Sequence, residues 1–103
     1  MEQTLGASSQ GLLTLGRTLP PGKWHEITRI NDATVYLVRA VPKSGEFDEH
    51  ADADEYVVVL DGVFRVETPQ GMTEAKAGES LLVPRGTPHR SRLDAEAIIL
   101  LIR

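Results

Sequence analysis

The stretch GEFDEHADADEYVVVLDG, residues 45–62, decides how the rest of the sequence is interpreted. Asp48 and His50 stand two positions apart, so their side chains point to the same side of an extended segment. A short acidic turn follows, and Glu55 then opens a run rich in β-branched residues that favours a strand ending at Gly62. A return strand brings the Glu55 carboxylate back opposite His50. The stretch therefore predicts one imidazole and two carboxylates that converge, a first-row metal site that lacks one more nitrogen.

A second stretch, GESLLVPRGTPH, residues 78–89, supplies that nitrogen. Its apolar residues 81–83 predict a short strand, and the segment from Pro84 to Pro88 predicts a rigid turn. His89 begins the next extended piece. The candidate metal ligands are therefore Asp48, His50, Glu55 and His89.

The second stretch resembles one of the two signature motifs of the cupin superfamily, whose members are small antiparallel β-barrels with a metal in the barrel. It matches as Gly78, five residues, Pro84, one residue, Gly86, two residues and His89. The trailing Asn of that motif is replaced by Leu93. The match therefore runs through the histidine that the metal site needs.

The first stretch resembles the other cupin motif with one departure. His50, four residues, Glu55, six residues and Gly62 keep the usual spacing, and Asp48 stands where the first histidine belongs. In a different register His50 is the first ligand and Asp52 the second, which leaves two residues before Glu55 where the motif has three or four. Asp48 is preferred, and Asp52 remains a competing ligand.

The resemblance extends over roughly residues 24–103 and implies an all-β fold, the antiparallel double-stranded β-helix or jelly-roll barrel of cupins. Turn signals that recur about every 8 to 12 residues independently favour a barrel or sandwich. Asn31-Asp32 predicts the turn of a hairpin, and AIILLI at residues 97–102 predicts a central strand. We expect residues 12–103 to form one domain and residues 1–11 to form a flexible arm.

Leu12, Leu13 and Leu15 form an apolar piece whose partner the sequence leaves open. One alternative is that it packs on its own barrel as a strand or helical turn. The other, which the resemblance to cupins suggests, is that it lies across a second subunit of a homodimer. Residues 33–41 are apolar on both faces, so we expect cover from the barrel interior and from another sheet or subunit.

Charge and composition exclude several classes of protein. A net charge of −4 and a pI near 5.3 argue against a nucleic-acid partner. No run approaches the roughly 18 apolar residues of a membrane span, and the first residues do not resemble a signal peptide. The expected location is therefore cytoplasmic, without a membrane partner. Because the sequence contains no cysteine, nitrogen and oxygen must hold any metal.

The four candidate ligands suit a buried divalent ion. Their two carboxylates and the ion sum to a charge near zero, which lowers the cost of burial in an apolar barrel. Zinc, manganese, iron(II) and nickel all accept such ligands, and an octahedral ion keeps two positions for other molecules. Without Asp48, the two histidines and Glu55 resemble the facial triad of non-haem iron oxygenases.

A pocket beside the metal requires side chains that point inward. The aromatic candidates are Trp24, Tyr36, Phe47, Tyr56 and Phe64. Arg39 binds a substrate carboxylate if its face is internal, and we favour a surface position for it.

These observations predict a small metal-binding cupin that binds or acts on a small organic molecule. As an enzyme it would be a metal-dependent oxygenase, isomerase or cyclase, and no catalytic residue is assigned. The alternative is a non-catalytic sugar-binding, metabolite-binding or regulatory cupin with a weakened or absent metal site. A structural or partner-binding barrel is the third hypothesis, because fold alone does not select a function.

Overall fold

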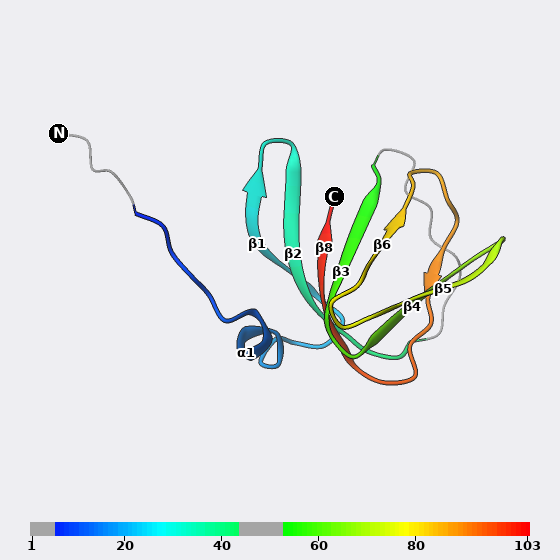
Figure 1. Cartoon of the computed structure of the whole chain (residues 1–103), viewed down its shortest axis with the longest axis horizontal. Coiled ribbons are helices and arrows are strands. Elements are labelled where there is room, and N and C mark those ends of the chain that lie inside the picture. The colour runs from blue at the N-terminus through cyan, green and yellow to red at the C-terminus, as the bar shows by residue number, and fades with distance from the viewer. Residues whose placement is uncertain (1–5, 44–52) are drawn as a thin grey trace.

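The computed structural model describes residues 6–43 and 53–103, which form one short helix and a set of antiparallel strands (Figure 1). In chain order the elements are α1 (Leu12–Gly16), β1 (Trp24–Ile30), β2 (Ala33–Ala40), β3 (Glu55–Asp61), β4 (Val63–Thr68), β5 (Gly71–Lys76), β6 (Ser80–Val83), β7 (Arg90–Ser91) and β8 (Ala97–Ile102). Within these ranges no helix is long and apolar enough to cross a bilayer.

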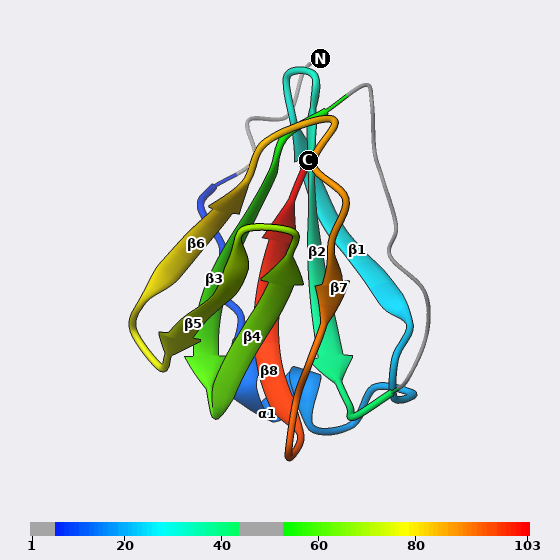
Figure 2. The ribbon, with the colours of Figure 1, turned by 90° about the vertical axis from the view of Figure 1, so that its right-hand side faces the viewer.

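Two antiparallel sheets face each other. Among the described residues, one sheet has the order β1-β2-β8-β3-β6 and the other the order β5-β4-β7. Figure 2 shows the smaller sheet in front of the larger one. This arrangement confirms the predicted all-β antiparallel jelly-roll, although the described strands do not join into one closed barrel.

The last strand, β8, lies at the centre of the larger sheet, between β2 and β3. Its apolar run is continuous because both of its faces are covered. Ile99 and Leu101 belong to the core between the sheets, whereas Ile98 belongs to a second cluster on the outer face. The predicted central position of residues 97–102 is therefore confirmed.

The outer face of β2 and β8 is covered by the segment that contains α1. Leu37 and Ile98 are buried there, with Leu19 beside them and the leucines of α1 packed against them. Gly16 permits this close approach, because a Cβ at its position would lie 2.7 Å from Cγ2 of Ile98. The second cover over β2 is thus a helical turn of the same chain.

The first hairpin agrees with the predicted turn. Residues of β1 pair with β2 from Trp24 opposite Val38 to Ile30 opposite Ala33. Asn31 adopts the left-handed backbone that this tight turn requires, with φ of 54°. The hairpin thereby places Trp24 beside the inner face of the sheet.

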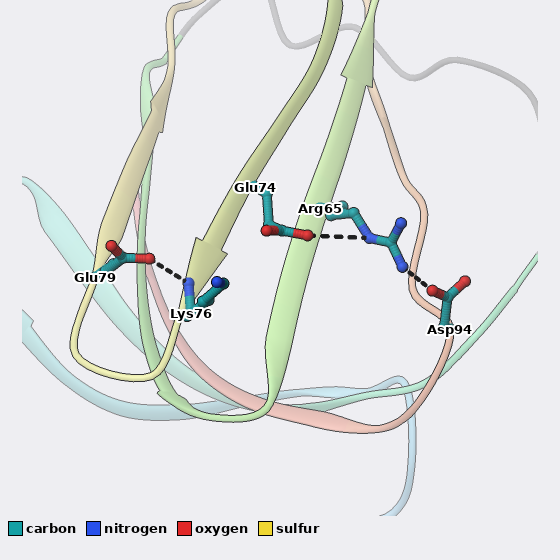
Figure 3. A network of polar contacts seen from close by, with 5 residues as sticks. All are labelled: Arg65, Glu74, Lys76, Glu79 and Asp94. Atoms are coloured by element: carbon teal, nitrogen blue, oxygen red, sulfur yellow. Dashed lines mark hydrogen bonds and ion pairs between the residues drawn. The ribbon is translucent and has the colours of Figure 1, made fainter.

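The outer face of the smaller sheet is charged. Arg65 on β4 pairs with Asp94, and its Nε lies 3.8 Å from Oε1 of Glu74 on β5 (Figure 3). In the next turn the backbone N–H of Lys76 donates to Glu79 Oε1 at 2.8 Å. Since charge covers this face, the apolar side chains of β4 point the other way, into the space between the sheets.

Candidate metal centre and cavity

An apolar cavity of about 130 Å³ lies between the two sheets. Its walls come mainly from aliphatic and aromatic side chains, among them Val38, Val57, Phe64, Val66, Ile99 and Leu101. Glu55, His89 and Ser91 add polar groups to the lining. A small apolar space with a few polar groups is the usual form of a small-molecule site.

Glu55, the first residue of β3, points inward. It is 6% exposed, and the alternation along the strand buries Val57 and Val59 on the same face. A carboxylate is costly to bury unless positive charge or hydrogen bonds stabilise it. Its burial therefore argues against the role of an ordinary solvated charge at a strand edge.

His89 faces Glu55 from the opposite sheet through one ring nitrogen. Nδ1 lies 2.8 Å from the carbonyl oxygen of Thr87, and because a carbonyl oxygen only accepts, Nδ1 donates. In the neutral ring Nε2 then carries a lone pair, the form in which histidine binds metals. The hydrogen bond to a carbonyl thus orients the ring and leaves Nε2 directed at Glu55.

The two groups lie slightly farther apart than two neighbouring ligands of one ion. Nε2 of His89 lies 4.0 Å from Oε1 of Glu55, which is beyond hydrogen-bond distance. Two ligands that each lie about 2.0–2.2 Å from one tetrahedral zinc ion are about 3.4 Å apart. The pair would have to approach by about 0.6 Å to occupy two positions around one tetrahedral cation.

Local contacts hold the two motifs together. β3 pairs with β6 so that Glu55 stands opposite Val83, immediately before the turn that leads to His89. Asp54 Oδ1 accepts a hydrogen bond of 2.8 Å from the backbone N–H of Arg85 within that turn. The residue before one candidate ligand thus fixes the turn that delivers the other.

Arg103 is a site residue that sequence reasoning missed. Tyr56 pairs with Ile102, so the next position places Arg103 across from Glu55 at the end of β8. Its Nη1 lies 4.0 Å from Glu55 Oε1, and its guanidinium lies 5.7 Å from the centre of the Trp24 ring. Because the run before it is apolar at every position, no alternation in the sequence predicts this orientation.

The first half of the motif at residues 45–62 lies outside the residues that the structure describes. Asp48, His50 and their competitor Asp52 lie outside the described residues, as does Phe47. Within residues 6–43 and 53–103 no group of three or more histidine and carboxylate side chains converges on one point. The described part of the predicted centre is therefore the pair formed by Glu55 and His89.

The aromatic candidates divide between the two faces. Trp24 and Phe64 line the cavity, and Tyr36 packs against the core with its ring 5.2 Å from that of Trp24. The candidate Tyr56 does not line the cavity, because this side chain is 42% exposed and its hydroxyl bonds to Ser80 on the outer face. Glu55 and Tyr56 are neighbours on one strand and must face opposite ways.

Arg39 lies on the outer face, as the favoured surface position requires. Its Nε donates to Glu96 Oε1 at 2.6 Å, and its Nη1 donates to the Leu19 carbonyl at 3.3 Å. Arg39 therefore serves the packing of the outer segment and not the cavity.

Ion pairs attach the short strand β7, which follows His89, to β4. Glu67 Oε1 accepts from Arg90 Nε at 2.9 Å and lies 3.3 Å from Arg92 Nε. The hydrogen bond from Arg90 lowers the pKa of Glu67 below its ordinary value of 4.5, and the charges of Arg90 and Arg92 add to this effect. The pairing stabilises the strand that begins next to the candidate ligand.

Comparison with known proteins gives a consistent family description. A family model described as "Cupin domain" matches residues 36–102. A curated relative from Bacillus subtilis (strain 168), described as uncharacterized protein YdbB, is 39% identical over 69 residues, which are 64% of this chain and 58% of that protein. The chain therefore spans less than two thirds of the length of the curated relative it matches.

Solved structures with the same fold include proteins of different function. A cupin-2 domain containing protein from Shewanella frigidimarina superposes with a TM-score of 0.80 at 24% identity, covering 87% of each chain. Hydroquinone 1,2-dioxygenase PnpCD, solved in complex with Cd2+ and 4-hydroxybenzonitrile, superposes with a TM-score of 0.74 at 19% identity, over 99% of this chain and 80% of that chain. At these identities the likeness shows the fold alone.

Proposed function

This chain belongs to the cupin family, and from that premise we propose that it holds a divalent metal ion beside its cavity and binds or transforms a small organic molecule there. The observation that carries the proposal is that Nε2 of the partly buried His89 and Oε1 of the buried Glu55 face each other at 4.0 Å on the cavity wall. The proposed ligands are Asp48, His50, Glu55 and His89, with Asp52 as the alternative to Asp48.

The donor set supports an ion of the borderline class. An imidazole nitrogen and a carboxylate oxygen suit zinc, manganese, iron(II) or nickel, and the sequence has no cysteine to favour a softer ion. The apolar walls lower the local dielectric, which strengthens the attraction between a cation and the Glu55 carboxylate. Both features fit a resident metal ion at this place.

The chain's own residues would position the small molecule and protect it from water. Such an ion, when bound, supplies Lewis-acid polarisation or a redox centre, according to its identity. Val57, Phe64 and Ile99 exclude water from the space beside it. The carbonyl of Thr87 keeps the His89 ring oriented, and a carboxylate that does not bind the ion can accept a proton at its oxygen.

A second function is favoured by the cavity itself. Its walls are mostly apolar, and the first motif has Asp48 in place of a histidine. A non-catalytic barrel that binds a sugar or metabolite, or regulates through it, requires the cavity without a strong metal site. The metal content of the protein separates the two functions.

We also propose that residues 12–103 form one domain after an arm of residues 1–11, and that the functional unit is a homodimer. Tyr56 and Leu82 support a dimer contact, since they are paired neighbours on the outer face of β3 and β6 and are 42% and 57% exposed. The cytoplasmic location and the absence of nucleic-acid and membrane partners stay predictions from the sequence.

The test is elemental analysis of protein purified without a metal-affinity tag, before and after supply of manganese, iron, nickel or zinc. His89→Ala and His50→Ala are the ligand variants. His25→Ala is the matched control, because His25 is an exposed histidine on β1. We expect metal near one equivalent in the wild type and the control, and a loss of at least tenfold in affinity in the ligand variants.

A wild-type protein that takes up none of the four metals would refute the metal centre and favour the non-catalytic barrel. Equal metal content in the His89→Ala variant and the His25→Ala control would show that the ion binds elsewhere.

A further inference from the structure

Arg103 is held at the end of the structure where the candidate metal pair lies. β3 begins, β8 ends and the chain enters β7 at this end (Figure 2). The backbone of Arg103 exchanges hydrogen bonds of 2.7 and 3.0 Å with Thr34, which extends the pairing of β8 with β2. Its side chain is 22% exposed, so the guanidinium has little freedom of position.

Two contacts define where the guanidinium lies. It sits 4.0 Å from Glu55 Oε1 on one side and 5.7 Å from the centre of the Trp24 ring on the other. Both of these partners line the cavity. The face of an indole ring stabilises a cation at this distance, so Trp24 holds Arg103 at the boundary of the cavity.

The charge and size of the cavity select a class of ligand. Among the described residues, the cavity lining includes two cations, Lys43 and Arg90, and one carboxylate, Glu55. Arg90 pairs with Glu67. Arg103 stands at the boundary, 4.0 Å from the Glu55 carboxylate. A guanidinium offers five N–H donors in a planar fork that matches a carboxylate. The cavity has about 130 Å³, which is near the roughly 150 Å³ in which an engineered apolar cavity binds benzene.

We propose that Arg103 recognises the anionic group of the ligand, and that the ligand is a small organic carboxylate whose apolar part fills the cavity. This inference deepens the proposed function and rests on it, because the cavity is the one beside Glu55 and His89. Arg103 takes the role that the sequence allowed for Arg39, whose guanidinium is bound to Glu96 on the outer face. The alternative role for Arg103 is purely structural, as the cross-strand partner of Glu55.

The experiment measures charge preference in the cavity. Benzoate and benzamide have nearly the same shape and differ in charge, and their affinities are measured by calorimetry for the full chain. The variants are Arg103→Gln and Arg103→Lys. Arg29→Gln is the matched control, because Arg29 is an exposed arginine on β1 that pairs with Glu26. Circular dichroism and metal content are recorded for each protein.

We expect the wild type and the Arg29→Gln control to bind benzoate at least tenfold more tightly than benzamide. Arg103→Gln should lower benzoate affinity by about 10- to 100-fold, the usual effect of losing a hydrogen-bonded charge, with benzamide affinity unchanged. Arg103→Lys should retain part of the preference, since it keeps the charge but loses the fork. A structural role would change stability and leave the ratio of the two affinities unaltered.

Equal affinities of the wild type for the acid and the amide would overturn the inference. So would a preference that survives in Arg103→Gln, or failure of every acid from acetate to benzoate to bind at millimolar concentration. Metal uptake without charge preference rejects Arg103 and retains the metal centre. If the charge preference depends on Arg103 but the protein takes up no metal, the role of Arg103 is retained and the metal centre is rejected.

Discussion

Replacement of Gly62 by alanine tests why the first motif ends in glycine. Gly62 links β3 to β4 with φ of +84°, and a Cβ there would lie 2.9 Å from the Glu96 carbonyl oxygen and 3.1 Å from the Ala97 Cα. The left-handed backbone costs an alanine about 1–2 kcal/mol. The contacts are with backbone atoms that cannot rotate away, and such overpacking costs about 1–3 kcal/mol more. We therefore expect Gly62→Ala to lose about 2–5 kcal/mol of unfolding free energy.

Gly78→Ala is the control that separates the two costs. Gly78 has φ of +87°, but a Cβ there would have no atom within 4 Å. It should lose about 1–2 kcal/mol. Urea unfolding at one protein concentration measures both variants, and with a slope of about 2 kcal/mol/M the midpoint of Gly62→Ala should fall by about 1–2.5 M. If Gly62→Ala proves no less stable than Gly78→Ala, the backbone contacts at Ala97 carry no cost and the reasoning fails.

Two further predictions concern the contacts that hold the second motif. Asp54→Ala should lose about 0.5–1.5 kcal/mol in urea unfolding, because the Arg85 N–H loses its acceptor, and Asp54→Asn should lose less because it keeps an oxygen. Equal stability of Asp54→Ala and the wild type would contradict this. Glu67 has a pKa lowered by the Arg90 hydrogen bond, so its stabilising contribution is present above pH 4.5 and is lost as the pH falls through the lower folded-state value. The stability advantage of wild type over Glu67→Gln should therefore shrink between neutral pH and pH 3, and an advantage independent of pH would count against the ion pair.

Much of the fold follows from local patterns. Asn31 tolerates the backbone of the first hairpin turn, with φ of 54°. The run at residues 97–102 is apolar on both faces because β8 is central. Glu55 and His89 were predicted from spacing, and the structure places them 4.0 Å apart. In each case the residue type and its local neighbours carry the physical cause.

The errors and omissions concern orientation and contacts between distant segments. Tyr56 was one of five aromatic candidates for the cavity and points outward. The sequence left this open, because a change of one residue in register reverses every side chain of a strand. The cover over the outer face of Leu37 comes from α1, which is one of the alternatives that the leucines before Pro20 left open. Arg103 was missed because its partners, Glu55 and Trp24, lie far away in the sequence.

The sequence by itself determined the family, the all-β architecture and the residue types available to a metal, because motif spacing, turn residues and periodicity are local properties of the chain. Only the tertiary structure decided that His89 uses Nδ1 for the Thr87 carbonyl and turns Nε2 to Glu55, and that Arg103 stands across from Glu55. These contacts join segments that are far apart in the sequence. The pairing of distant strands determines them, and no local pattern encodes which side chains meet across the cavity.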